Sequence, residues 1–136
     1  MNLVSIRIIT ADLPRLVAFY EEVTGLQADW ATPRFAELRS PAGTLALADV
    51  ATVPLFGPGS AVPAANRSAI VEFVVDDVDT THARLVDRLD DVVTPPTTMP
   101  WGNRALLFRD PDGNLVNLFT PVTEAARARQ RAQLAG

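Results

Sequence analysis

Short segments rich in β-branched residues alternate with longer segments of helical period along this chain of 136 residues. Residues 3–10 (Leu-Val-Ser-Ile-Arg-Ile-Ile-Thr) are short and β-branched, which predicts a strand. On similar grounds we expect strands at 27–31, 34–39, 44–49, 69–76, 92–94, 103–109 and 114–120. In residues 13–24 apolar side chains recur with helical period between an N-capping residue, Asp12, and a terminating Gly25. This segment should therefore form an amphipathic helix.

The second half of the chain repeats the order of the first. Residues 39–45 (Arg-Ser-Pro-Ala-Gly-Thr-Leu) recur as residues 109–115 (Arg-Asp-Pro-Asp-Gly-Asn-Leu), with arginine, proline, glycine and leucine at the same offsets. A second helix, predicted at 78–90, begins after Asp77 as the first begins after Asp12. A period near half the chain indicates duplication of one supersecondary unit, because a solenoid needs three or more shorter repeats. Two such units can bury one face against each other and leave a cleft at their seam.

The repeat sets the expected organisation of a single domain. Unit one spans 1–49, a linker spans 50–68, unit two spans 69–121 and a C-terminal tail spans 122–136. The linker is rich in proline and glycine, and a loop of this length often has a function. Residues 123–134 favour helix but have no apolar stripe, so we expect an exposed or frayed tail.

Composition excludes several classes of function. The chain has no cysteine, which excludes disulfides, thiolate metal sites and a cysteine nucleophile. All 12 basic residues are arginine, so Schiff-base chemistry and a Walker-type phosphate loop are excluded as well. A net charge of −4 argues against a nucleic-acid partner and mildly favours neutral or cationic ligands. No segment is apolar over the length of a membrane helix, and we expect a cytoplasmic protein with no membrane partner.

Two motifs give the chain a resemblance to a known superfamily. The Phe19-Tyr20 pair lies in the first predicted helix, and Asp-Pro-Asp-Gly forms the turn of residues 109–115. With the doubled β-α-β-β-β order, they resemble the vicinal-oxygen-chelate superfamily, which holds glyoxalase I, extradiol dioxygenases, fosfomycin-resistance transferases and bleomycin-resistance proteins. Trp101-Gly102 followed by Arg104 is most similar to the bleomycin-resistance branch. The resemblance implies an α+β fold in which a curved, half-barrel mixed sheet carries its helices on the convex side, and it implies a homodimer.

The same resemblance implies where metal ligands would lie. Metal-dependent members place a histidine in the first strand of a unit and a glutamate or histidine in its last strand. The histidine positions correspond to Ser5 and Ile70, and the carboxylate positions to Leu47, or Ala46 after a slip of one residue, and Asn117. These side chains include no imidazole or carboxylate, the groups that hold a divalent ion. We therefore expect neither a metal nor another cofactor.

Strand alternation predicts two charged side chains in the cleft. The face of the first strand that carries Ser5 also carries Arg7, and the face that carries Ile70 also carries Glu72. A charge directed into a cleft must be paired or must meet a ligand. Arg7 and Glu72 could form an internal ion pair, could bind polar groups of the ligand, or could lie at strand ends in water.

Large aromatic residues near loops and edge strands exceed what a core of this size needs. Flat ligands could stack on them, or they could close the ends of the half-barrel. The predicted ligand-contacting residues are Arg7, Trp30, Phe35, Leu47, Phe56, Glu72, Trp101 and Asn117. His82, the one histidine, is expected on the inward face of the second helix, in a packing role. Asp110 and Asp112 are expected to serve the turn.

Three functions are compatible with these features. The first is metal-independent capture of a natural product or antibiotic. The second is a metal-independent isomerase, cyclase or lyase of secondary metabolism, in which Glu72 would act as acid or base and Arg7 would stabilise an oxyanion. The third is a metal-dependent lyase or dioxygenase with displaced ligands. We rank ligand capture first, because the replaced ligand positions leave an apolar surface with few polar groups.

Overall fold

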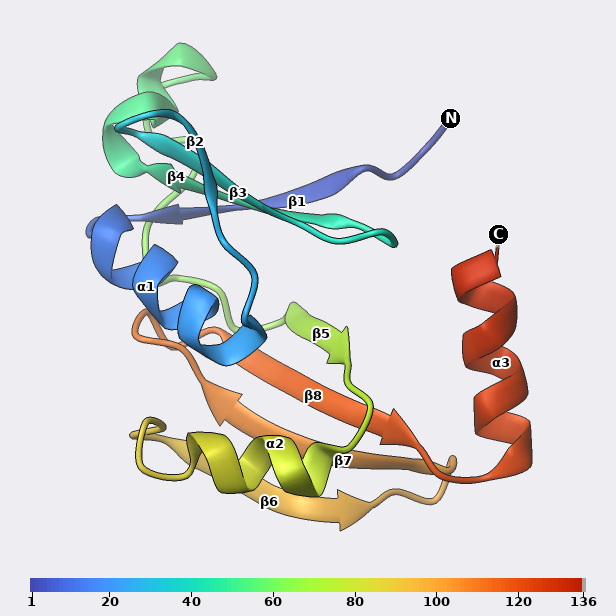
Figure 1. Cartoon of the computed structure of the whole chain (residues 1–136). Helices are drawn as coiled ribbons and strands as arrows, with labels where there is room; N and C mark the ends of the chain where they lie inside the picture. Colours follow the sequence, from blue (N-terminus) through green and yellow to red (C-terminus); the bar gives the residue numbers. More distant parts are fainter. Residues whose placement is uncertain (136) are drawn as a thin grey trace. The chain divides into compact units, whose positions relative to one another are not determined.

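A computed structural model describes residues 1–135 and has an α+β fold, as the sequence predicts (Figure 1). Its elements in chain order are β1 (Ser5–Thr10), α1 (Leu13–Thr24), β2 (Asp29–Thr32), β3 (Phe35–Arg39), β4 (Thr44–Asp49), a 3₁₀ helix η1 (Val50–Leu55), β5 (Ile70–Val74), α2 (Val78–Leu85), β6 (Val92–Thr98), β7 (Asn103–Arg109), β8 (Leu115–Pro121) and α3 (Glu124–Ala135). They form two compact units. The first consists of residues 1–66 and 111–113, and the second of residues 67–110 and 114–136.

Each unit contains a four-stranded mixed sheet of the same topology. The strand order is β1-β4-β3-β2 in the first sheet and β5-β8-β7-β6 in the second. The first strand of each unit pairs in parallel with the last, and the remaining pairs are antiparallel. The helix between the first two strands provides the crossover that a parallel pair requires. The predicted β-α-β-β-β order is therefore confirmed in both units.

The first helix packs on β3 and β4 through five side chains. Its start is capped by Asp12, whose carboxylate accepts a hydrogen bond from Arg15 N at 3.2 Å, and its end is marked by Gly25 in the left-handed region, with φ of 72°. Glycine adopts that conformation at little cost, which explains why the helix stops there. The buried side chains, at helical spacing, are Leu13, Leu16, Val17, Tyr20 and Val23.

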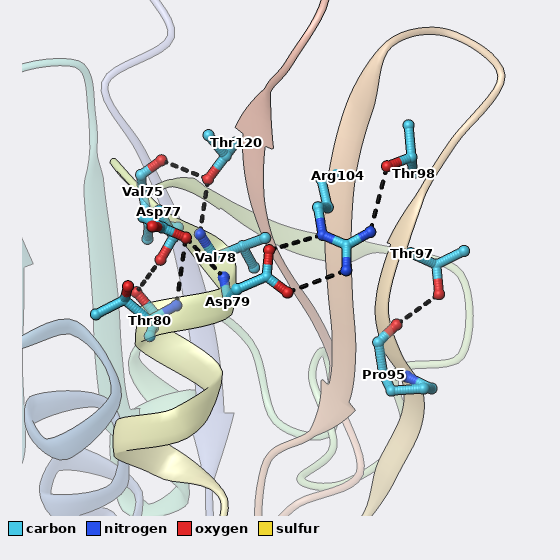
Figure 2. A network of polar contacts seen from close by, with 11 residues as sticks. Val75, Asp77, Val78, Asp79, Thr80, Pro95, Thr97, Thr98, Arg104 and Thr120 are labelled. Carbon is cyan, nitrogen blue, oxygen red and sulfur yellow. Dashed lines mark hydrogen bonds and ion pairs between the residues drawn. The ribbon is translucent and has the colours of Figure 1, made fainter.

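The second helix is shorter and is held at its start by β8. Asp77 caps it by accepting hydrogen bonds from two backbone N–H groups of the first turn. Figure 2 shows the hydroxyl of Thr120, in β8, accepting from Val78 N and donating to Val75 O, both at 2.9 Å. The helix ends at Leu85, without a left-handed residue, and not at position 90 as predicted. Like its counterpart it lies on one face of its sheet, against β6, β7 and β8 (Figure 1).

An ion pair joins the first turn of α2 to β7. Arg104 Nε and Nη2 donate to the two carboxylate oxygens of Asp79 at 2.7 and 3.0 Å, and Nη1 lies 3.3 Å from Thr98 Oγ1 (Figure 2). The Arg104 guanidinium hydrogen bonds hold the pKa of the Asp79 carboxyl below its ordinary value of 3.8. This pair lies on the helix-covered side of the second sheet and stabilises the helix start, so Arg104 has a structural role.

Each sheet has one apolar, buried face that its helix covers. In the first sheet Ala36, Leu38, Leu45 and Leu47 point to the side on which α1 packs. In the second sheet the covered face is equally apolar, and its fully buried side chains are Leu106, Phe108, Val116 and Leu118. The opposite face of the second sheet carries polar and partly exposed groups, among them Glu72, Asn117 and Phe119.

Three segments differ from their predicted form. The strand expected at 92–94 continues to Thr98 through Pro95 and Pro96, which is possible because β6 is the outer strand of its sheet, where a missing N–H costs little. The expected linker begins with η1. The C-terminal tail forms the helix that its sequence favours and is exposed over most of its length, as expected, although Ala126 is buried and the helix contacts β8. Among residues 1–135 no helix has the length and apolar character required to cross a bilayer.

Candidate functional site

Glu72 and Asn117 lie side by side on the open face of the second sheet. They are register partners in the parallel pair β5–β8, and Asn117 Nδ2 donates a hydrogen bond to Glu72 Oε2 at 2.8 Å. The alternation of β8 places Phe119 on the same face, two residues further on. Their neighbours Val116 and Leu118 point to the covered side and are buried. The predicted placement of Glu72 and Asn117 on one face is confirmed.

The turn between β6 and β7 brings Trp101 to the same side of the unit. Gly102 in this turn has φ of 95°, and its carbonyl oxygen accepts hydrogen bonds from Val122 N at 2.8 Å and Thr123 N at 3.3 Å. A Cβ at Gly102 would collide with Thr123 Oγ1 and lie 3.1 Å from the Ala126 side chain. The turn and the start of α3 can approach this closely because position 102 has no side chain.

The helix α3 presents a polar stripe next to Trp101. Ala126, Arg129, Gln130 and Gln133 follow the i, i+3, i+4, i+7 spacing that places side chains on one face of a helix. We refer to Arg129, Gln130 and Gln133 as the polar stripe. Arg129 Nη2 donates to the backbone oxygen of Trp101 at 2.9 Å, which ties the stripe to the turn. The helix is therefore held by one buried alanine, the Gly102 contacts and one arginine.

These groups line an open pocket with a volume of about 600 Å³, which we call the α3 pocket. Glu72, Asn103, Asn117 and Phe119 line it from the sheet, Trp101 from the turn, and Ala126 and the polar stripe from α3. Its volume lies within the range of about 300–1,000 Å³ that is usual for small-molecule sites. The pocket combines two aromatic rings with a carboxylate, a guanidinium and several amides, so it can contact a flat organic molecule and hydrogen-bond to its polar groups.

The first unit gathers a different set of predicted site residues. The Arg7 guanidinium carbon lies 4.6 Å from the centre of the Phe35 ring and 5.1 Å from that of Phe56. Both distances are within the usual limit for a cation–π contact of about 6 Å. The register partner of Arg7 on β4 is Ala46, which has no polar side chain to offer. Arg7 thus has aromatic neighbours where Glu72, at the equivalent position, has an amide.

Two of the predicted ligand-contacting residues, Leu47 and Trp30, lie on the face of the first sheet opposite Arg7. Leu47 is the register partner of Ile8 and Ala36, not of Arg7, and it is fully buried on the face that α1 covers. Counting four residues past Gly43 placed it one position out of register, and Ala46 is the residue that shares the face of Arg7. Trp30 pairs with Ala36, so its side chain also belongs to the face opposite Arg7.

The remaining polar residues singled out in the sequence serve the fold. Asp110 is buried and accepts hydrogen bonds from Asn114 N at 2.9 Å and Asn114 Nδ2 at 2.7 Å, which confirms its role in the turn. His82 is half-buried on α2, on the side of the helix that carries the buried Val78 and Leu85. It does not line the α3 pocket.

The residues at the implied metal positions do not suit a divalent ion. Ser5 and Ile70 stand on the first strands, and Ala46 and Asn117 stand opposite Arg7 and Glu72 on the last. In the second unit the carboxylate of Glu72 lies opposite Asn117, and the hydrogen bond from Asn117 directs an N–H, not a lone pair, toward it. Among residues 1–135 no three His, Cys, Asp or Glu side chains gather as a metal site requires. The donor set therefore disagrees with the metal chemistry of the superfamily.

The fold is a doubled β-α-β-β-β arrangement, and its second unit carries the α3 pocket as a candidate site. The chain belongs to the Glyoxalase/Bleomycin resistance protein/Dioxygenase superfamily, whose family model matches residues 2–118. It is 26% identical over 125 residues to the uncharacterized protein YraH of Bacillus subtilis (strain 168), covering 88% of this chain and 98% of YraH.

Solved structures agree with this assignment. A glyoxalase/bleomycin resistance protein/dioxygenase from Nocardioides is 26% identical, with a TM-score of 0.73, and the match covers 91% of this chain and 85% of that one. A protein of unknown function from Agrobacterium tumefaciens str. C58 has a TM-score of 0.77 at 22% identity, covering 88% of this chain and 94% of its own. The second likeness concerns the fold alone.

Sequence reasoning missed a large part of the pocket. Asn103 and Phe119 share the open face of the second sheet with Asn117, and strand alternation could have identified Phe119. The polar stripe of α3 was overlooked because the helix was searched for an apolar face. A stripe of arginine and glutamine at helical spacing is itself a signal, since such a face can line a polar pocket.

Proposed function

We propose that this protein binds a small organic molecule in the α3 pocket, without a metal ion, in the manner of a natural-product or antibiotic binding protein. The α3 pocket is the observation that carries the proposal. It has a suitable volume, two aromatic rings and several convergent polar groups. Small-molecule sites usually pair an apolar lining with a few polar groups, and the lining of the α3 pocket is more polar than that, with six polar side chains beside two aromatic rings and Ala126.

The donor set supports the proposal that binding needs no metal. The carboxylate of Glu72 is hydrogen-bonded by an amide N–H, and Asn117 and Asn103 are neutral amides, which are poor substitutes for imidazole and carboxylate. The catalytic alternative needs Glu72 and Arg7 as acid or base and oxyanion donor. Glu72 contacts Asn117 and Arg7 contacts two phenyl rings, and neither arrangement favours proton transfer over binding.

Arg7, Phe35 and Phe56 form a second candidate contact surface, in the first unit. A guanidinium over two rings keeps its N–H edges available for a planar carboxylate. Phe56 is 67% exposed, so a ligand could cover its ring. We propose these three residues as additional ligand contacts, in agreement with the sequence-based prediction.

We further propose that the protein is a homodimer. β1 and β5 are the outer strands of their sheets, and they carry exposed apolar side chains at Ile6, Ile70 and Val74. Strand edges with apolar side chains invite pairing with another chain. Light scattering at micromolar concentration should give twice the mass of the chain, and the monomer mass would contradict the proposal.

The test of the binding function is an NMR titration of the labelled protein with a panel of aromatic natural products and antibiotics. We expect a hit to shift the Trp101 indole N–H and the side-chain amides of Asn103 and Asn117, with equal affinity in EDTA and in added divalent metal. A hit that binds only with metal would overturn metal independence. Shifts confined to α2 and His82, with the α3 pocket silent, would overturn the proposed site.

A further inference from the structure

We propose that the ligand of the α3 pocket is a flat zwitterion, with an ammonium group that Glu72 binds and an anionic group that Arg129 binds. The inference rests on the proposed function, because it names the class of ligand that the same pocket would take. It arises from two opposite charges that stand on different elements, β5 and α3, and line one cavity.

The sheet side of the pocket has more acceptors than donors. The Glu72 carboxylate receives one hydrogen bond, from Asn117 Nδ2. Asn117 Oδ1 is covered from solvent and has no hydrogen-bond partner among residues 1–135. Buried acceptors of this kind usually have a partner, and one without a partner calls for a donor that the protein itself does not supply. An ammonium group offers three donors, enough to engage the carboxylate and leave one for a neighbouring oxygen.

The helix side of the pocket supplies donors. Arg129 uses one Nη2–H for the Trp101 backbone oxygen, and that bond restrains the side chain next to the cavity. A guanidinium has five N–H groups, so several remain for a carboxylate or other planar anion. Because part of its rotational freedom is already lost, the restrained arginine has less freedom to lose when a ligand binds. Gln130 and Gln133 continue the stripe with neutral amides that can donate or accept.

Glu72 and Arg129 do not neutralise each other. Glu72 bonds to Asn117 and Arg129 to Trp101, and no ion pair joins the two within the described chain, residues 1–135. A ligand with a single charge would match one of them and leave the other unmatched. A ligand with both charges can match both, so each charge raises affinity and also selects the orientation of the ligand.

The lining of the pocket also contains two aromatic rings. Phe119 lies on the sheet floor and is half-buried, and Trp101 is 61% exposed at the turn. These rings favour a flat apolar body, because offset stacking and edge contacts are the preferred arrangements of aromatic pairs. The ligand class is therefore a planar core with an amine at one side and an anion at the other.

The experiment compares four probes that share one ring: 4-(aminomethyl)benzoate, 4-methylbenzoate, 4-methylbenzylamine and 4-methylbenzyl alcohol. Each is titrated into the labelled full chain at pH 7, and the dissociation constant is taken from the Trp101 indole shift. We expect the zwitterion to bind about tenfold more tightly than either singly charged probe, because it adds one charge-assisted contact. The alcohol should bind most weakly.

Four variants assign each charge to its residue. Arg129→Gln should abolish the tenfold advantage of the zwitterion over 4-methylbenzylamine, and Glu72→Gln should abolish its advantage over 4-methylbenzoate. Arg127→Gln, on another face of α3, and Asp87→Asn, an exposed carboxylate outside the pocket, change the charge equally and should keep both advantages. An amide spectrum of each variant establishes that it is folded.

The outcomes separate the two proposals. If the alcohol binds as tightly as the zwitterion, with the shifts in the α3 pocket, the zwitterion inference is wrong and the proposed binding function remains. If Arg127→Gln lowers the advantage as much as Arg129→Gln does, the assignment of Arg129 is wrong. If no probe and no member of the natural-product panel shifts the pocket residues, the binding function itself is wrong.

Discussion

Arg7 of the first unit and Glu72 of the second unit occupy equivalent positions, yet their surroundings have little in common. Opposite Arg7 stands Ala46, and opposite Glu72 stands Asn117. The first residue contacts aromatic rings, and the second receives an amide hydrogen bond at 2.8 Å. Because the backbone pairing is the same, the difference lies in the side chains of the open face. Duplication has kept the scaffold and given the two open faces different chemistry.

The helices of the two units also differ. α1 buries five side chains and ends at a left-handed glycine, whereas α2 buries two, Val78 and Leu85. The second unit also carries α3, for which the first has no counterpart. The shorter helix therefore buries fewer apolar side chains. The unit with the pocket is therefore the one with fewer apolar contacts from its crossover helix.

The largest expected effect comes from replacing one buried leucine in each unit. This comparison tests whether the covered faces of the two units contribute equally to the free energy of unfolding. Leu47 and Leu118 hold equivalent positions on the covered faces and are at most 1% exposed. Leu47→Ala and Leu118→Ala should each lower the free energy of unfolding by about 3 kcal/mol, the usual loss when a buried leucine leaves a cavity. Urea unfolding measures both. If Leu47→Ala weakened ligand binding and left stability unchanged, its placement on the covered face would be wrong.

The turns before the last strands should differ in their contribution to stability. Asp110 is buried and accepts two hydrogen bonds from Asn114, whereas Ser40, at the same place in the first repeat, is exposed. Asp110→Ala removes a buried acceptor that receives two hydrogen bonds and should cost about 2 kcal/mol. Ser40→Ala should cost less than about 0.5 kcal/mol, as surface changes usually do. Equal losses in urea unfolding would show that the turns are energetically equivalent.

Two glycines provide a matched test of how α3 is held. Gly102 has φ of 95° and no room for a Cβ beside Thr123, whereas Gly43 lies outside that region of φ and has no heavy atom within 4 Å of an added Cβ. Gly102→Ala should cost about 1–2 kcal/mol and increase hydrogen exchange along α3. Gly43→Ala should be neutral or stabilise by about 0.5 kcal/mol. Unchanged exchange in α3 after Gly102→Ala would contradict docking through Gly102.

The smallest predicted effect concerns the ion pair at the start of α2. The hydrogen bonds from Arg104 lower the pKa of Asp79 below 3.8 in the folded chain, so this contribution is present above pH 3.8 and is lost as the pH falls through the lowered pKa. The melting temperature of Asp79→Asn should therefore lie slightly below that of the wild type at neutral pH, and the gap should close in acid. Both residues are substantially exposed, so the gap should be smaller than the other effects. A gap that widens in acid would contradict this assignment.

The elements with a strong local signal could be predicted from sequence. Residues 13–24, 44–49 and 103–109 have the predicted bounds, because capping residues, glycine and alternation act locally. The end of α2 was misplaced by five residues, since Val86 offers no stop signal. Leu47 was assigned to the open face because a count from Gly43 cannot detect a shift of one residue, which reverses the face of a side chain.

The pocket could be predicted only in part. Glu72 and Asn117 followed from alternation and from the repeat, whereas Trp101 was inferred from its place near a loop. Arg129 could not be placed by local rules, because its contact with the Trp101 backbone joins residues 28 positions apart. Such a contact depends on how closely α3 approaches Gly102. Tertiary packing sets that distance, and the local sequence pattern does not predict it.

The polar stripe of α3 also has an evolutionary consequence. α3 buries one residue, Ala126, and Arg129 adds one exposed hydrogen bond, so substitutions at Arg129, Gln130 or Gln133 would change the side chains that a ligand in the α3 pocket meets at a small cost to stability. Natural proteins tolerate change where it does not bring them below their stability threshold. A lineage could thus acquire a new ligand through drift in its last helix while both sheets stay constant. Directed evolution for altered recognition should begin at these three positions.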